Sequence, residues 1–272
     1  YQNKVKTNLA VFPHENLPGY ISMMNDVNHT YTKPYLSSRL EYKLRRATFV
    51  LNLPLSLNHA TTNNREEKQE LTKVFLNPKL SFKYEFNNMF KINASGQYEQ
   101  NIDNFENYYD NPVLSDYQSL FTMIAPMSVS DLTRANVRFT FNQPFYAINS
   151  SLSYTYQHRN SDIIYKYDID ENGASYLQMI ESPNTSDYHV INLNVKKFIS
   201  VIKTTIGLKA NLLHNTRHNI LNGSLVENKN ISASIMPNMM VTIKHWAHFN
   251  YSFNFNNIQT FSEDVKKSDV NY

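Results

Sequence analysis

Two short groups of residues in this chain have the types and spacing that could bind a metal ion. Residues 168–173 read Asp-Ile-Asp-Glu-Asn-Gly, which matches the opening of a calcium-binding loop. The twelfth position of such a loop needs a bidentate glutamate but is Met179 here, so an Asn-Gly turn is the simpler interpretation. His214 and His218 are four residues apart, as on a metal-binding helix, but they lie at the end of a strand pattern without an evident third ligand.

Motifs for covalent chemistry are missing from the sequence. None of the nine histidines has a triad-like spacing to a serine and an aspartate, and no serine lies in a G-x-S-x-G turn. With only 5 glycines, the chain has no glycine-rich phosphate loop. The sequence therefore predicts a protein that is not an enzyme and that has no catalytic residues, metal ion or cofactor.

Two sets of side chains are candidates for binding. The first belongs to an acidic and aromatic stretch that could contact a ligand outside the cell, although tyrosine and asparagine also suit ordinary exposed loops. The second alternates along one strand and would line a lumen. There it would either contact a plug or form a mutually paired, solvated ladder of charges, the interpretation that we favour. The ligand-contact candidates are Phe105, Tyr108, Tyr109 and Tyr117, and the lumen candidates are Arg39, Glu41, Lys43 and Arg45.

Strands must position these side chains, because apolar and polar residues alternate through five hairpins with very short turns. Successive side chains of a strand point to opposite faces, so each strand has an apolar face and a polar face. With an opening strand at residues 4–11, the pattern predicts about eleven strands of roughly nine to twelve residues, near the length that crosses a bilayer at a tilt. The hairpins cover residues 36–58, 76–98, 135–156, 191–212 and 231–256.

Long polar stretches separate the hairpins. Residues 12–34, 61–72, 157–187 and 257–272 are predicted loops, and the third contains a small hairpin near Asn172 and Gly173. Residues 100–133 hold either an extra strand or a folded loop. Pro54, Pro78 and Pro237 fall within strand patterns, and each needs a bulge or a strand end because proline cannot donate a hydrogen bond to a neighbouring strand.

Composition narrows the class of protein further. The chain has no run of about 18 apolar residues, which excludes a transmembrane helix. The net charge of +3 is small and dispersed, so no basic stripe indicates nucleic acid. A mean hydropathy of -0.51 is compatible with a β-barrel, in which only every second strand residue faces lipid. The absence of cysteine suits an exported bacterial protein, and a start at Tyr1 without a signal segment predicts a piece of a longer chain.

Short turns at one end of the strands and long loops at the other are the plan of an outer-membrane β-barrel. We therefore predict an all-β fold, an antiparallel transmembrane β-barrel of about eleven strands. The alternative is a soluble β-sandwich, in which the apolar face is the core. Strand length, consecutive charges on the polar face and aromatic residues near the strand ends all favour the barrel.

Two hairpins carry a resemblance to a known family. They are LNPKLSFKYEFNNMFKINASGQYEQ, residues 76–100, and DYHVINLNVKKFISVIKTTIGLKANLLHN, residues 187–215. In this style of sequence the chain resembles the barrel of TonB-dependent outer-membrane receptors, particularly the asparagine- and tyrosine-rich kind found alongside the broader outer-membrane β-barrel protein family. The resemblance covers most of the chain and includes no signature motif.

The resemblance implies that residues 1–272 are one segment of a larger barrel with about 22 strands. The plug domain has no match here and would lie upstream, and the final strands would follow residue 272. The implied function is uptake of a nutrient, a sugar, a peptide or a metal chelate, across the bacterial outer membrane. The implied partners are outer-membrane lipid, the protein's own plug, a TonB-type energy-coupling complex and a surface lipoprotein. The alternatives are a non-transporting barrel, such as an adhesin or an assembly factor, and a soluble β-sandwich binding module.

Overall fold

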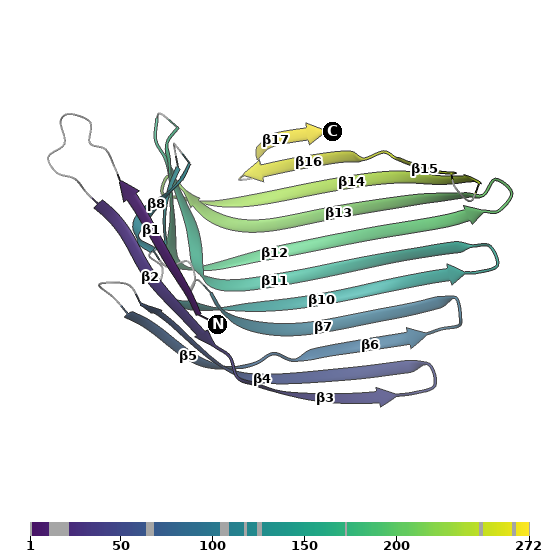
Figure 1. Cartoon of the computed structure of the whole chain (residues 1–272), viewed down its shortest axis with the longest axis horizontal. Coiled ribbons are helices and arrows are strands. Elements are labelled where there is room, and N and C mark those ends of the chain that lie inside the picture. The colour runs from purple at the N-terminus through teal and green to yellow at the C-terminus, as the bar shows by residue number, and fades with distance from the viewer. Residues whose placement is uncertain are drawn as a thin grey trace.

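The computed structural model consists of strands joined by turns (Figure 1). It describes residues 2–10, 22–63, 68–103, 109–116, 119–123, 127–171, 173–244, 247–262 and 265–271. Within these ranges no helix is long and apolar enough to cross a membrane. The strands are β1 (Gln2–Ala10), β2 (Ser22–Thr32), β3 (Tyr35–Lys43), β4 (Ala47–Asn63), β5 (Lys68–Leu76), β6 (Lys79–Glu85), β7 (Phe90–Asp103), β8 (Tyr109–Asp116), β9 (Ser119–Met123), β10 (Ser128–Gln143), β11 (Ile148–Ile169), β12 (Ser175–Ile199), β13 (Thr204–Leu221), β14 (Ser224–Lys244), β15 (Ala247–Ser252), β16 (Phe255–Ser262) and β17 (Val265–Asn271).

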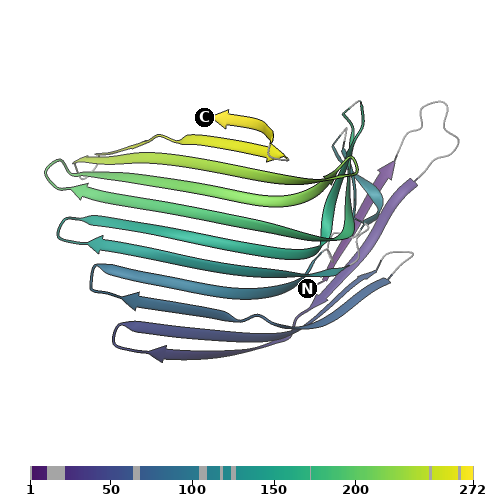
Figure 2. The same cartoon turned by 180° about the vertical axis from the view of Figure 1, so that it is seen from behind.

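All of these strands belong to one sheet, seen from both sides in Figures 1 and 2. β2 and β3 lie end to end along one side of β4, and β5 and β6 lie end to end along its other side. β15 and β16 lie end to end along β14 in the same way. Each of these three pairs is therefore one interrupted strand. Counted in this way the sheet has 14 strands, is mainly antiparallel and is not closed into a barrel. The predicted all-β antiparallel class is confirmed, and closure into a barrel stays a prediction.

The predicted number of about eleven strands is wrong, because several predicted loops are strands. β2 lies within residues 12–34, most of residues 61–72 belongs to β4 and β5, and the last predicted loop forms most of β16 and all of β17. In the undecided stretch 100–133, β8 and β9 form an additional hairpin, and β9 pairs in parallel with β12. These segments lack a clean alternation of apolar and polar residues, so the strand pattern does not show in their sequence.

The four strands β11 to β14 are also longer than predicted, with 22, 25, 18 and 21 residues. Residues 157–187, predicted as a loop, continue β11 and β12 to a tight turn. There the Gly173 N–H donates to the carbonyl oxygen of Asp170 at 3.1 Å, and Gly173 has a φ of 81°, which glycine adopts readily. The predicted turn near Gly173 is confirmed, but it ends the long hairpin itself; Asn172 lies outside the described residues.

Backbone pairing sorts the side chains of each strand onto two faces of the sheet. Arg138 of β10 lies opposite Ser153 of β11, and Ser153 lies opposite Asn192 of β12, so these polar residues share one face. In the same way Phe139 lies opposite Leu152, and these residues share the other face. We call these the polar face and the apolar face. The register runs without a shift from β7 through β10, β11, β12 and β13 to β14 over the part of the sheet near the short turns.

Prolines coincide with interruptions of the sheet. Pro78 falls between β5 and β6, which confirms the predicted strand end. The prediction is wrong for Pro54 and Pro237, because β4 and β14 continue through them and the neighbouring strand breaks instead. The Asn77 N–H donates to the Pro54 carbonyl at 3.0 Å, and the Phe253 N–H donates to the Pro237 carbonyl at 3.1 Å, both from residues within those breaks. The carbonyl groups of both prolines therefore keep a backbone partner at the breaks.

The far end of the β11–β12 hairpin is turned over relative to its base. Near the short turns β11 lies between β10 and β12, but residues 166–167 of β11 pair in parallel with β13, and residues 175–179 of β12 pair in parallel with β9. The order of the two strands is thus reversed. The change follows a register shift between Ser161 and Ile163 of β11. Pro183 of β12 lies opposite this shift and has no paired residue. The Asn184 side chain spans this point by donating to the carbonyls of Ile163 and His218.

A small core forms at the end of the sheet away from the short turns. Phe75 of β5 is 2% exposed and packs with Ala60 of β4 and Ile102 of β7. Next to it the Tyr31 hydroxyl donates to Asn58 Oδ1 at 2.6 Å, which satisfies two polar groups of neighbouring strands. This corner of the sheet is therefore held by side-chain packing as well as by backbone pairing.

The packing of this corner gives a first prediction. Replacing Phe75 by alanine should lower the free energy of unfolding by about 3–5 kcal/mol, because it leaves a cavity in the core. Val74, the preceding residue, is 62% exposed on the opposite face, so Val74→Ala should change the free energy by less than about 1 kcal/mol. Urea unfolding followed by the β-sheet circular dichroism signal measures both. Equal effects would show that Phe75 is not in a core.

Candidate functional site

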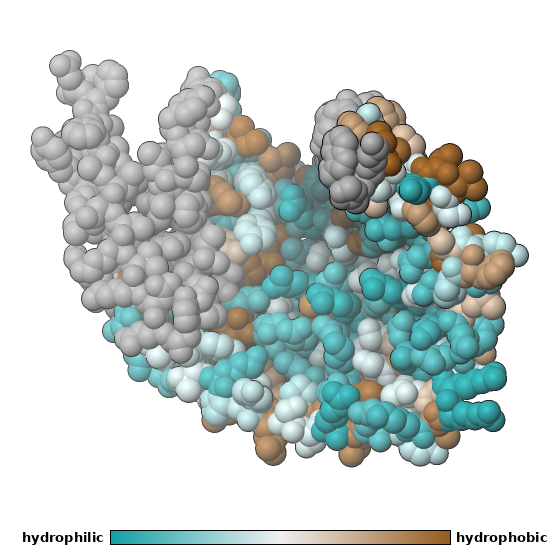
Figure 3. Space-filling view, turned by 45° about the vertical axis from the view of Figure 1, so that its right-hand side comes forward, coloured by the Kyte–Doolittle hydropathy of each residue, from teal (hydrophilic) through white to brown (hydrophobic). Residues whose placement is uncertain are grey.

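The apolar face is the largest exposed feature of the sheet. Its residues remain open along β3, β4, β7 and β10 to β16, and Phe139 near its centre is 50% exposed. Figure 3 shows the other side, where hydrophilic residues cover most of the hollowed surface. Exposed members of the apolar face include Leu36, Leu40, Leu55, Leu57, Phe90, Leu152, Ile191, Ile206, Leu208, Ile235, Met239, Phe249 and Phe255.

The apolar face ends at a boundary of tyrosine, histidine and charged residues. On β11 the sequence of side chains on this face changes from Leu152 through Tyr154 and Tyr156 to His158. The Tyr154 hydroxyl lies 2.9 Å from His189 Nδ1, and Asp187 Oδ1 accepts hydrogen bonds at 2.9 Å from the Tyr156 hydroxyl and from His158 Nδ1. Aromatic rings with polar tips suit a border between an apolar and an aqueous phase.

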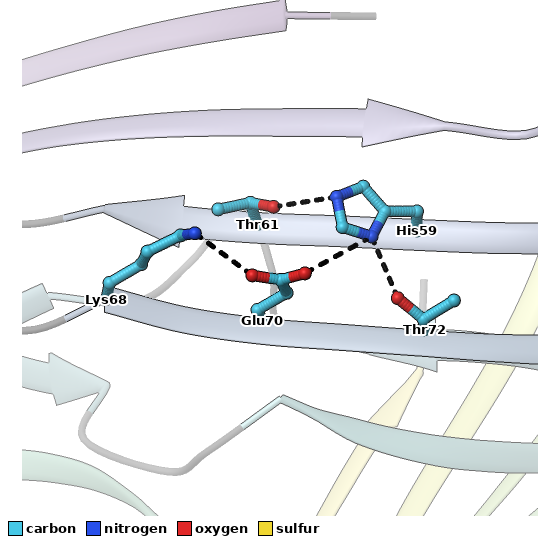
Figure 4. A network of polar contacts seen from close by, with 5 residues as sticks. All are labelled: His59, Thr61, Lys68, Glu70 and Thr72. Carbon is cyan, nitrogen blue, oxygen red and sulfur yellow. Dashed lines mark hydrogen bonds and ion pairs between the residues drawn. The ribbon is translucent and has the colours of Figure 1, made fainter.

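A second part of the boundary lies on β4 and β5 (Figure 4). The last apolar pair is Leu57 with Val74, and the next pair on this face is His59 with Thr72, whose side chains are 2.8 Å apart. Glu70 lies 3.9 Å from His59 and 3.0 Å from Lys68. The Lys68 ammonium, by its hydrogen bond and charge, holds the pKa of the Glu70 carboxyl below its usual value. Polar networks therefore end the apolar face at both places.

The polar face carries the predicted lumen residues. In β3, Glu41 Oε2 accepts from Arg39 at 3.0 Å, and Glu41 Oε1 lies 2.8 Å from the Lys43 ammonium. These three residues thus form a mutually paired ladder of charges, exposed to solvent on the polar face. Arg45 lies beyond β3 in the short turn, so it is not part of the strand. Contact with a plug stays a prediction.

The predicted ligand-contact residues fall where the structure does not describe side chains. Phe105, Tyr108 and Tyr117 lie outside the described residues. Tyr109 begins β8, and only its backbone is described. A role in ligand contact therefore stays a prediction for all four residues.

A polar hollow on β7 and β10 to β13 was missed by the sequence analysis. One cavity of about 400 Å³ and another of about 270 Å³ share Arg159, Ser186 and Asn215. Arg159 Nη2 donates to Asp103 Oδ2 at 2.5 Å and to Ser130 Oγ at 3.3 Å. No sequence motif marks this hollow, because its residues come from five strands and only their register brings them together. The lining is rich in amides and hydroxyls and includes Asn101, Ser130, Gln157, Tyr188, Asn184 and Thr185.

The two predicted alternatives for metal binding have other roles in the structure. Asp170 Oδ1 accepts from the Ala174 N–H at 2.8 Å and so closes the hairpin turn, and Asp168 forms an ion pair with Lys166 at 2.6 Å. The His214 ring stacks on His189, with ring centroids 5.9 Å apart. In the described part of the chain, no three His, Cys, Asp or Glu side chains are grouped as a metal site would require.

Comparison with known proteins gives no match. No protein-family model matches it, and neither a curated protein nor a solved structure matches it. The structure therefore defines a class, an open all-β sheet with one apolar and one polar face. The resemblance to TonB-dependent receptors stays a prediction from the style of the sequence.

The hollow gives a second prediction, on the Asp103–Arg159 ion pair. A double-mutant cycle with Asp103→Asn and Arg159→Gln should give a coupling energy of about 1 kcal/mol, because the Asp103 side chain is only 16% exposed. The same cycle on Lys68 and Glu70 is the control. Both of those side chains are about half exposed and screened by solvent, so their coupling should be clearly smaller. Urea unfolding measures both, and equal coupling would contradict the prediction.

Proposed function

We propose that this chain forms part of the wall of a bacterial outer-membrane β-barrel, and that the barrel is a TonB-dependent receptor for nutrient uptake. The observation that carries the proposal is the open apolar face. Long strands present apolar side chains on one face over much of the sheet, and polar networks end that face on β4–β5 and on β11–β13. A surface of this kind is stable in lipid and unfavourable in water.

Hydrogen bonding supports the same location. In hydrocarbon, every backbone N–H and C=O needs a partner, and long antiparallel ladders provide partners across the sheet. The ladder of β13 and β14 alone pairs residues 204–221 with 224–241 without a shift. The open edges of the described sheet would need further strands before the barrel could close, which agrees with a segment of a larger barrel.

The soluble β-sandwich is less well supported. It would need a second sheet packed on the apolar face, as in other sandwiches. In the described residues this face remains exposed, and the buried clusters are small: one lies around Phe75, and another joins Ile163 and Met179. The amide-rich polar face is also typical of the inner wall of a barrel, where it contacts water or a plug.

In the receptor, the chain would contribute wall, lumen surface and the extended hairpins beyond the boundary. A nutrient would bind to these hairpins and to the polar hollow, an upstream plug would close the lumen, and a TonB-type complex would supply energy. A surface lipoprotein could cover the extracellular end. The chain itself would perform no covalent chemistry.

A matched pair of substitutions tests the lipid-facing assignment. Phe139 and Thr140 are neighbours on opposite faces of β10. Phe139→Arg should lower the stability of the barrel in phosphatidylcholine vesicles by about 2–4 kcal/mol, because it places a charge in lipid. Thr140→Arg should change it by less than about 1 kcal/mol, because it faces the lumen.

The measurement uses the full-length protein in the outer-membrane fraction and in vesicles. A folded barrel should migrate differently on a gel before and after boiling in detergent, and the fraction of this species across a urea series gives the stability. A soluble monomer that keeps its β-sheet signal without detergent would contradict the membrane assignment. In that case the apolar face would have to be covered by a second layer.

Nutrient uptake separates the receptor from an adhesin or an assembly factor. Cells that lack the gene should grow more slowly on one limiting sugar, peptide or metal chelate, and the gene should restore growth only while the proton gradient that drives TonB-type coupling is intact. Growth that is unchanged on every nutrient tested, with the barrel still in the outer membrane, would favour a non-transporting barrel.

A further inference from the structure

The two faces of the sheet differ in charge as well as in hydropathy. Over the shared ladder of β7 and β10 to β14, the polar face carries seven cationic side chains and two acidic ones, whereas the apolar face carries two lysines and three acidic residues. The whole chain is nearly balanced, with 26 basic and 23 acidic residues. The polar face is therefore the electropositive one. Its charged residues are Lys91, Glu99, Asp103, Arg134, Arg138, Arg159, Lys196, Lys209 and Arg217.

Three of these cations form a group near the short turns. Arg138 of β10, Lys196 of β12 and Lys209 of β13 are all exposed and lie in three consecutive rows of the register. Lys209 lies opposite Asn194, two residues from Lys196, so the two lysines are diagonal neighbours about 7–8 Å apart at the backbone. Arg138 lies three strands and one row from Lys209, about 16 Å away. One anionic solute of moderate size can span this group.

Within the described part of the chain, none of the three side chains has an acidic partner. Elsewhere on the polar face, Lys83 and Lys91 both pair with Glu85, and Arg159 pairs with Asp103. The group is therefore not part of the paired ladder that neutralises neighbouring strands. Exposed cations without partners add little to stability, so their placement together on one face needs another reason.

Amide side chains surround the three cations. Lys196 lies between Asn149 of β11 and Gly207 of β13. The Asn238 side chain covers Gly207, since a Cβ at that glycine would come within 2.3 Å of Asn238 Oδ1. Asn194, which lies opposite Lys209, belongs to the same set of amides on this face. Ammonium, guanidinium and amide donors together match the oxygens of an anion.

We propose that Arg138, Lys196 and Lys209 form an anion-binding patch on the lumen wall, for a solute that carries several carboxylate or phosphate groups. This inference rests on the proposed function, because it requires the polar face to line an aqueous lumen. Basic side chains in a pore attract anions and select them over cations. The patch narrows the nutrient to an anionic one, such as an acidic sugar, an acidic peptide or an anionic metal chelate.

Binding of a fluorescent polyanion to the full-length protein in detergent tests the patch. The trisulfonated dye pyranine should bind, and citrate or pyrophosphate should displace it; the more effective competitor distinguishes carboxylate from phosphate. Removing all three charges, with Arg138→Gln, Lys196→Gln and Lys209→Gln, should weaken binding by roughly tenfold or more at low salt, and added salt should abolish the difference.

Lys197→Gln is the matched control. Lys197 follows Lys196 on β12 but lies opposite Ile148 and Ile206 on the apolar face, so the change removes the same charge from the other side of the sheet. It should change binding by less than about twofold, whereas Lys196→Gln alone should weaken it by roughly threefold. If the triple variant does not fold, the comparison of Lys196→Gln with Lys197→Gln tests the anion-binding patch.

The outcomes separate the patch from the receptor. A folded, heat-modifiable barrel that does not bind the dye, or that loses binding equally with Lys197→Gln, would overturn the anion-binding patch and leave the barrel intact. A protein that stays soluble without detergent would overturn the proposed function itself.

Discussion

The register of the backbone ladder is the constraint on which the rest of this structure depends. Side chains alternate between faces with a period of two residues, so a slip of one residue in any strand would move its apolar side chains to the polar face. The register holds without a shift from β7 through β14 near the short turns, and the apolar face is continuous there. The hydrogen bonds thus fix which residues meet, and the side chains make only one register favourable.

The same register explains why the cationic side chains gather on the face that is also the more polar one. Arg138 and Phe139 are adjacent in sequence but lie on opposite faces of the sheet. Each therefore lies among residues of its own kind, because residues paired across neighbouring strands share a face. Lys196 and Lys197 show how fine the separation is, since neighbouring lysines of one strand lie on opposite faces. This separation leaves the polar face of the sheet electropositive.

Irregularities in the sheet occur where the ladder cannot be maintained. Pro54 and Pro237 remain within long strands because the adjacent strand breaks beside them. Pro183 lies at the register shift after which the β11–β12 hairpin is turned over. Beyond that point β11 and β12 exchange neighbours, and parallel contacts with β9 and β13 replace the meander. Pro183 therefore marks the border between a regular part of the sheet and a part with its own topology.

The sequence by itself determined the all-β class, the five hairpins near the short turns and the two faces, because alternation is a local property of each strand. It also predicted the paired charges of Arg39, Glu41 and Lys43, which are neighbours on one strand. Only the tertiary structure decided the extended strands, the β8–β9 hairpin, the hollow around Arg159 and the grouping of Arg138, Lys196 and Lys209. These features join residues from distant strands, and their register depends on pairing across the whole sheet, which no local pattern encodes.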